Sequence, residues 1–287
     1  MANLKEIRNR IASVSSTMQI TSAMKMVSAA KLKKAQDAIS SMRPYANTLA
    51  ELIQNLSATM DTDSQNPYTN IRKIESVLIV AITSNRGLCG AFNANITKKV
   101  HQLISEDLNN KKVSVITIGK KGSESLYKSV KVVSSHDDLF DDLTYNNSSE
   151  IAQLAMDKYE EKVYDKIILV YNKFKNAATQ IVNVESYLPI IPNTEKDNIS
   201  SADYIFEPNQ YEIVKDLIPK ALKIQFFKAI RDSFASEHGA RMTAMHKATD
   251  NATELRDQLK LTYNKARQAA ITNEILEIVG GAEALND

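Results

Sequence analysis

The stretch whose residue types most suggest chemistry is TSNRGLCGAFN at 83–93, which follows the apolar run SVLIVAI and holds two of the seven glycines. A strand, a glycine-bearing turn and a helix start are the context in which backbone N–H groups surround a phosphate. Gly87 and Gly90, however, lack the third glycine of a dinucleotide fingerprint and the Lys-Ser/Thr pair of a phosphate loop. Because such a turn needs glycine for its backbone angles with or without a ligand, the pattern favours a tight turn over a phosphate site.

Other groups capable of catalysis or metal binding are scattered along the chain. The four histidines show neither an i,i+4 pair nor a metal-ligand spacing to a carboxylate: His101, His136, His238 and His246. The acidic run HDDLFDDL at 136–143 lacks the glycine and the terminal glutamate of a calcium loop, so it is interpreted as a solvated face. The single cysteine, Cys89, excludes an internal disulfide and indicates a reducing compartment. We expect no catalytic, cofactor-binding or metal-binding residue.

Charge is nearly balanced over the 287 residues, at +2, but the first 43 residues are strongly basic. Only Glu6 and Asp37 oppose eight cations there: Lys5, Arg8, Arg10, Lys25, Lys31, Lys33, Lys34 and Arg43. Such a segment is either an ordinary solvated helix face or a surface for nucleic acid, an anionic membrane or an acidic protein. Nucleic acid is disfavoured because no aromatic residue precedes Tyr45.

Both ends of the chain have the composition of long helices. No proline occurs before Pro44 and no glycine before Gly87, and breakers are again rare after Pro208. We therefore expect helices over about 3–58 and 210–285, of ~80 Å and more than ~110 Å. Neither helix fits inside a compact domain.

Apolar residues in the two end segments share the spacing of a coiled coil. From Leu4 to Met18 they are three and four residues apart, and Met245 to Leu259 repeat this pattern. The first seam then turns polar at Thr21. We expect one antiparallel coiled coil in which Leu4 lies near Leu259 and Met18 lies near Met245.

The middle of the chain alternates strand and helix patterns. The strand-like segments are 76–82, 112–119, 130–135, 166–174 and 179–188, with helical patterns at about 92–109, 120–129 and 148–163. This βαβ series predicts a Rossmann-like α/β domain with a mostly parallel five-stranded sheet whose last two strands form an antiparallel hairpin. The expected fold class is α/β, a shaft of two long helices with a side domain.

The domain boundaries are expected at two polar linkers, 60–70 and 189–210. They divide the chain into an N-terminal coiled-coil helix at 1–59, a central α/β domain at 71–190 and a C-terminal coiled-coil helix at 208–287. The N-terminus shows no targeting presequence, and no apolar run approaches the ~20 residues of a membrane span. Membrane association is therefore expected only through partners.

Three long motifs carry a resemblance to a known family. IRNRIASVSSTMQITSAMKMVSAAKLKKAQ and LTYNKARQAAITNEILEIVGGAEAL resemble the end signatures of the gamma subunit of the F-type ATP synthase, bacterial type, and SNRGLCG resembles its turn. The resemblance implies a non-catalytic central-stalk rotor that couples the membrane c-ring to ATP synthesis or hydrolysis at the beta subunits. It implies no cofactor, partners among the alpha, beta, epsilon and c subunits, and a peripheral place on the cytoplasmic face of the bacterial inner membrane.

The resemblance also implies which residues touch partners. The lower contact with the beta subunits would comprise Met24, Lys25, Arg86, Gly87, Cys89 and Arg241, and the upper contact Arg267, Gln268, Thr272 and Glu274. Ser22 stands where the family often has lysine and Asn85 where it often has aspartate, which leaves the charge pattern of the lower contact open. The alternative reading is an independent α/β nucleotide-binding enzyme with coiled-coil arms.

Overall fold

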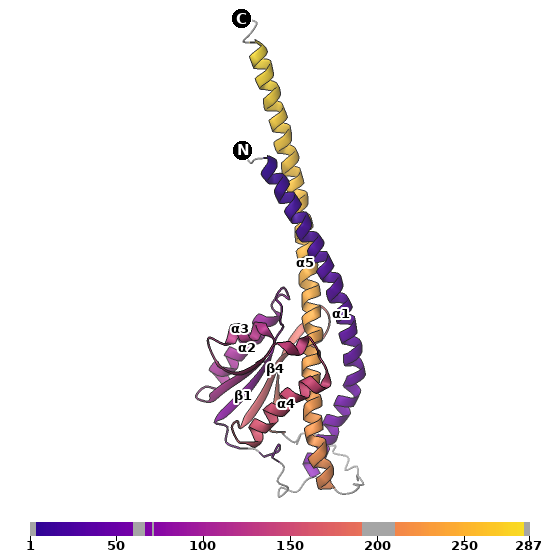
Figure 1. Cartoon of the computed structure of the whole chain (residues 1–287), viewed down its shortest axis with the longest axis vertical. Helices are drawn as coiled ribbons and strands as arrows, with labels where there is room; N and C mark the ends of the chain where they lie inside the picture. Colours follow the sequence, from indigo (N-terminus) through magenta and orange to yellow (C-terminus); the bar gives the residue numbers. More distant parts are fainter. Residues whose placement is uncertain (1–3, 60–66, 71, 191–209, 284–287) are drawn as a thin grey trace. The chain divides into compact units, whose positions relative to one another are not determined.

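The computed structural model describes residues 4–59, 67–70, 72–190 and 210–283 (Figure 1). The linkers expected at 60–70 and 189–210 lie largely outside these described residues. Contacts divide the chain into two compact units. The two-helix unit is Met1–Ser28 with Met242–Asp287, and the α/β unit is Ala29–Arg241. The three-part division expected from the sequence stays a prediction about domain boundaries.

The end segments form the expected long helices. Helix α1 is Leu4–Thr59, with 56 residues, and helix α5 is Gln210–Glu283, with 74 residues. Each contains one proline, Pro44 in α1 and Pro219 in α5. Both helices cross the boundary between the units, so each contributes one segment to the two-helix unit and another to the α/β unit.

Within the two-helix unit, α1 and α5 run antiparallel, as expected. Three side-chain contacts define the register: Arg8 Nη2 to Tyr263 Oη at 2.8 Å, Thr253 Oγ1 to Met18 Sδ at 3.3 Å, and Thr21 Oγ1 to Thr249 Oγ1 at 2.8 Å. As the residue number increases along α1, the number of the contacting residue on α5 therefore decreases by about the same amount. Burial follows the same seam, with Ile7, Thr21 and Met245 all below a tenth exposed.

The expected register of the coiled coil was wrong. Met18 contacts Thr253 and Arg256, so α5 is displaced by about one heptad from the pairing of Met18 with Met245. A seven-residue apolar repeat superposes on itself after a shift of seven residues, so it cannot distinguish the two pairings. Polar seam positions can, because a buried hydroxyl needs a partner, and Thr21 finds one in Thr249.

Engineered disulfides test this register. In a Cys89→Ala background, the pair Thr21→Cys with Thr249→Cys is expected to oxidise readily, because its native hydroxyls lie within hydrogen-bond distance. The matched pair Met18→Cys with Met245→Cys is expected to keep both thiols. Titration of free thiols after mild oxidation decides between them, and closure of the second pair alone would overturn the structural register.

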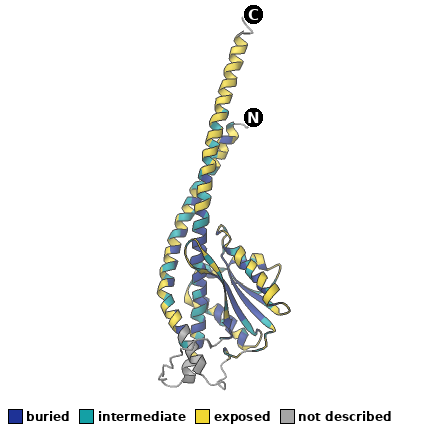
Figure 2. Ribbon diagram, turned by 180° about the vertical axis from the view of Figure 1, so that it is seen from behind, coloured by how far each residue is buried: buried dark blue, intermediate teal, exposed yellow. Residues whose placement is uncertain are grey.

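The α/β unit contains the five expected strands in one sheet. They are β1 (Ser76–Ile82), β2 (Lys112–Ile118), β3 (Lys131–His136), β4 (Lys166–Phe174) and β5 (Gln180–Leu188), in the spatial order β3-β2-β1-β4-β5. Pairing is parallel except between β4 and β5, which form the expected antiparallel hairpin. The continuous burial of β1 reflects a parallel strand covered on both faces (Figure 2).

Helices cover the two faces of this sheet differently. On one face lie α2 (Phe92–Gln102), the π-helical turn η1 (Leu103–Asp107) and α3 (Lys120–Leu126). The other face carries α4 (Tyr145–Glu160), and a short 3₁₀ turn, η2 (Asp138–Phe140), joins β3 to α4.

The second face is also covered by the first part of α5, which the sequence analysis assigned only to the coiled coil. Leu222, Phe226 and Ile230 of this part pack into the same core cluster as α4 and the sheet. All three are at most 2% exposed. The first part of helix α5 is therefore a layer of the α/β unit, and its later part is one helix of the coiled coil.

Candidate partner-contact surfaces

The glycine-bearing turn at 83–93 leaves the carboxyl end of β1 and is closed by its own side chains. Asn93 Oδ1 accepts from Ser84 N at 2.9 Å, and Ser84 Oγ donates to Arg86 O at 2.8 Å. Leu88 and Gly90 take positive φ values of 63° and 62°. The glycine at position 90 thus meets a backbone requirement of the turn itself.

Helix α5 holds this turn through a buried arginine. Arg241 Nη2 donates to Arg86 O at 2.9 Å and lies 3.4 Å from Gly87 O, while its Nη1 lies 2.6 Å from Glu237 Oε1. The side chains of Arg241 and Glu237 are each 9% exposed. A phosphate cradle presents N–H groups to an anion, whereas here two carbonyl groups face a cation. This geometry supports the tight-turn interpretation.

We call Arg86, Gly87, Glu237 and Arg241 the arginine clamp. Burial shifts the pKa values of Glu237 and of the neighbouring Cys89. Burial raises the pKa of Glu237, and the charge of Arg241 acts in the opposite direction. Burial also raises the pKa of the Cys89 thiol, which packs with Phe92 and Ala240 and is 2% exposed. Cys89 therefore supports the turn as a small neutral side chain.

The surface that this turn presents outward is smaller than the expected lower contact. Cys89 and Arg241 point into the protein, whereas Arg86 is exposed and Leu88 is 63% exposed. The sequence analysis missed Leu88, and only its exposure at a positive φ distinguishes it. It also missed Glu237, although the i,i+4 spacing to Arg241 was a usable signal.

Asn85 uses both ends of its side-chain amide inside the α/β unit. Its Nδ2 donates to the carbonyl of Asp137, and its Oδ1 accepts from Lys120 N at 3.1 Å. A carboxylate at this position could accept but could not donate. Asparagine at position 85, where the family often has aspartate, therefore fits the local hydrogen bonds, one of which needs a donor.

Met24 and Lys25 belong to the two-helix unit, whereas the turn and Arg241 belong to the α/β unit. Lys25 Nζ lies 3.4 Å from His246 Nδ1, and both side chains are solvent-accessible. Met24 is half-buried. The structure thus places the expected lower-contact residues on both units.

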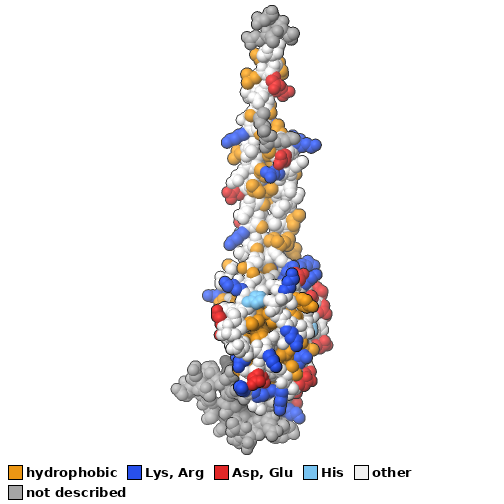
Figure 3. Space-filling model, turned by 90° about the vertical axis from the view of Figure 1, so that its left-hand side faces the viewer, with side chains coloured by type: hydrophobic (Ala, Val, Ile, Leu, Met, Phe, Trp, Pro, Cys, Tyr) orange, Lys and Arg blue, Asp and Glu red, His pale blue; other side chains and the backbone are white. Residues whose placement is uncertain are grey.

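The expected upper contact lies on the last part of α5, where every described residue from 267 to 282 is exposed (Figure 2). Arg267, Gln268, Thr272 and Glu274 all lie there, and Thr272 Oγ1 donates to Gln268 O at 2.9 Å. Apolar side chains share this tip (Figure 3), and the large ones are Ile271, Ile275, Leu276, Ile278 and Val279. A helix that exposes this many large apolar groups is typical of a docking segment.

His238 lies in α5 near the arginine clamp, and its buried ring cannot coordinate a metal ion in this arrangement. Its ring packs edge-on against Phe234 with centroids 4.5 Å apart, and both ring nitrogens are buried without a hydrogen-bond partner. Burial, followed by the charges of Arg241 and Lys31, lowers its pKa to about 4. The imidazole is therefore neutral at physiological pH.

His238 predicts a specific acid sensitivity. The unfolded chain takes up a proton on this histidine near pH 6.5 and the folded chain only near 4, so stability falls as pH drops through this window. Between pH 7 and 5 the wild type should lose about 2 kcal/mol more than His238→Leu. Urea unfolding at both pH values measures this difference, and an equal loss in the two proteins would contradict it.

Neither a metal cluster nor a membrane span is found where the structure describes the chain. No group of three or more His, Cys, Asp or Glu could hold a metal ion within the described ranges. No helix in the same ranges is long and apolar enough to cross a bilayer.

The whole chain matches known proteins. The ATP synthase family model matches residues 3–285. An ATP synthase gamma chain of Flavobacterium psychrophilum is 66% identical over 285 residues and covers 99% of both chains. The chain belongs to the ATP synthase gamma chain family. A Geobacter gamma chain with 44% identity likewise covers 99% of both chains, so the similarity extends through the middle segment as well as the ends.

Solved structures agree with this family and fold. The central stalk and c-ring structure of the Tetrahymena thermophila mitochondrial ATP synthase holds a chain with 26% identity and a TM-score of 0.60, which covers 80% of this chain and 99% of that one. A chain of the Euglena gracilis mitochondrial ATP synthase has 22% identity and a TM-score of 0.69, with coverage of 98% and 94%. The two long helices and the mostly parallel sheet are thus a fold shared with chains of these two ATP synthases.

Proposed function

We propose that this gamma chain is the rotor that couples rotation of a membrane c-ring to conformational change at the catalytic beta subunits. The exposed tip of α5 is the observation that carries the proposal. Its large apolar side chains have no partner among the described residues of the two-helix unit, so a surrounding protein sleeve is their natural environment. Catalysis belongs to the beta subunits in this assignment, and this chain contributes torque and asymmetry.

The partners follow from the same proposal. Arg267, Gln268, Thr272 and Glu274 engage the beta subunits at the tip, while Met24, Lys25, Arg86 and Gly87 face them lower down. The alpha subunits complete the sleeve, and the epsilon subunit and c-ring bind the α/β unit. The chain then lies peripherally on the cytoplasmic face of the bacterial inner membrane and reaches the bilayer only through partners.

A physical mechanism links the two-helix unit to catalysis. A rod transmits torque only if its helices resist sliding, and the seam through Ile7, Thr21 and Met245 provides that resistance. One asymmetric rod facing three similar sites favours a different conformation at each, which is a coupling free energy. Rotation then changes the nucleotide affinity of the three sites in sequence.

Two measurements on the purified full chain test the proposal. The chain is expected to assemble with alpha and beta subunits into an active ATPase, and to bind no nucleotide by itself in equilibrium dialysis with ATP. Nucleotide binding by the isolated chain, together with failure to assemble, would favour the independent enzyme with coiled-coil arms instead.

A further inference from the structure

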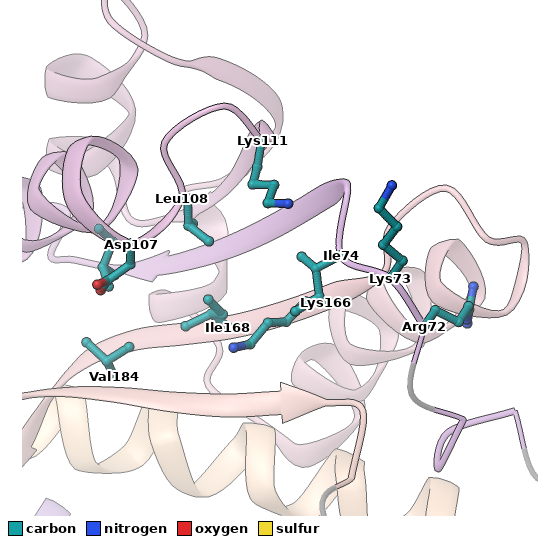
Figure 4. A pocket seen from close by; sticks show the side chains of 10 residues that line it. Arg72, Lys73, Ile74, Asp107, Leu108, Lys111, Lys166, Ile168 and Val184 are labelled. Carbon is teal, nitrogen blue, oxygen red and sulfur yellow. The ribbon is translucent and has the colours of Figure 1, made fainter.

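A pocket of about 500 Å³ lies at the amino ends of β1, β2 and β4, on the sheet face that α2 and η1 cover (Figure 4). The apolar side chains of Ile74, Ile168 and Val184 line it, and Val184 is 37% exposed. Helix η1 ends at Asp107, which lines the pocket and appears on the same side of it as Val184 in Figure 4. We call this the amino-edge pocket, and none of the residues assigned above to the beta-subunit contacts lines it.

Two lysines at the pocket have uncompensated charges. Lys111 precedes β2 and Lys166 opens β4; in Figure 4 the Lys166 side chain extends past Ile168 toward Val184, whereas the Lys111 side chain lies across the β1 ribbon from it. Neither ammonium group makes a hydrogen bond or an ion pair to any residue that the structure describes. Asp107 is the single carboxylate among the described residues of the lining. The pocket therefore joins an apolar lining to a positive rim.

Lys73 and the Nη2 atom of Arg72, the two other cations at the pocket, have partners, whereas Arg72 Nη1 is buried without a hydrogen-bond partner among the described residues. Lys73 Nζ pairs with Glu75 Oε1 at 3.1 Å. Arg72 Nη2 donates to Tyr159 O at 3.0 Å, and its guanidinium stacks over the Tyr159 ring at 4.4 Å. Lys111 and Lys166 are therefore the lining ammonium groups that could recognise a negatively charged ligand.

We propose that the amino-edge pocket binds an organic anion with an apolar body, such as an aliphatic or aromatic carboxylate. The body packs on Ile168 and Val184, and the head accepts hydrogen bonds from Lys111 and Lys166. The volume is within the range of small-molecule sites, which are mostly apolar with a few placed polar groups. Two ammonium groups supply charge-assisted bonds to the head.

Calorimetric titration of the full chain with decanoate tests this site. Lys166→Gln is expected to weaken binding about five- to tenfold, because one charge-assisted bond is lost. Asp107→Asn is expected to strengthen it about two- to threefold by removing a repulsive charge. The control Lys112→Gln changes an exposed lysine that does not line the pocket and should leave the affinity unchanged.

A second arm distinguishes a soluble anion from a lipid. Flotation with phosphatidylglycerol vesicles, compared with phosphatidylcholine vesicles, reports whether an anionic lipid can occupy the pocket. Decanoate binding without vesicle binding supports a soluble ligand, and binding of both with the same dependence on Lys166 supports a lipid. The proposal is overturned if decanoate does not bind, or if Lys166→Gln and Lys112→Gln bind it as tightly as the wild type.

Discussion

Replacing Arg241 with methionine is expected to lower the free energy of unfolding by about 3–5 kcal/mol, because it leaves a buried carboxylate without its partner. Arg241 is the ion-pair partner of Glu237 and donates to the carbonyl of Arg86. The Glu237 carboxylate would stay buried when the guanidinium is removed, whereas the Arg86 carbonyl would keep its hydrogen bond from Ser84 Oγ. Urea unfolding of the full chain, followed by circular dichroism, measures the loss.

The pH dependence of this variant identifies the cause. Without Arg241, burial holds the folded-state pKa of Glu237 above its unfolded value, so the folded chain retains a proton that the unfolded chain releases. Stability of Arg241→Met should therefore fall further as pH rises from about 5 to 7. The double variant Glu237→Gln with Arg241→Met should lack this slope and recover part of the stability.

Arg241→Lys is the matched control for charge. It keeps a cation near Glu237 but loses the planar group that reaches both Glu237 and the turn, so an intermediate loss is expected. A loss below about 1 kcal/mol for Arg241→Met would show that the clamp contributes little to stability.

Substituting Arg267 and Gln268 by alanine is expected to reduce ATP synthesis at least tenfold while leaving assembly nearly intact. Both side chains lie on the exposed tip of α5, so the stability of the chain itself should change by less than about 0.5 kcal/mol. Synthesis is expected to fall because the variant cannot form the charge-assisted bonds that these side chains make to the beta subunits during part of the cycle. ATP synthesis in reconstituted vesicles and the yield of intact complex measure the two effects.

Two controls define the role of the tip. Gln258→Ala with Lys260→Ala likewise removes one glutamine and one cation at exposed positions before the tip and should preserve synthesis. Removal of residues 274–287 should permit assembly and some ATP hydrolysis, because the lower contacts remain. Wild-type synthesis by the Arg267, Gln268 double variant would contradict the proposed contact.

The elements of the fold that could be predicted are those whose limits are marked by a change from apolar to polar residues. Strand β1 was predicted at its observed bounds because its continuous apolar run ends at the polar residues Thr83 and Ser84. The helical pattern at 92–109 was correct in type, but the change from α2 to the π-helical η1 at Leu103 leaves no mark in hydrophobic spacing. The coiled-coil register was missed because a heptad repeat is degenerate by seven residues.

The candidate surfaces were less predictable than the fold because they depend on which side chains are buried. The sequence shows that Cys89 and Arg241 occur in characteristic segments, but only packing places both inside the protein. Likewise, the spacing of Phe226 and Ile230 marks an apolar helix face without revealing that the sheet covers it. The exposed tip was predictable, since residues beyond about 265 had no partner in either register.

Rotation of this chain inside the assembled complex tests the central claim most directly. A probe can be attached through Tyr127→Cys, a position 77% exposed on the α/β unit, in a Cys89→Ala background. With the beta subunits fixed to a surface, ATP is expected to drive stepwise rotation of the probe in one direction, with three dwells per turn. A probe that stays still while the same complexes hydrolyse ATP would contradict the assignment of this chain as the rotor.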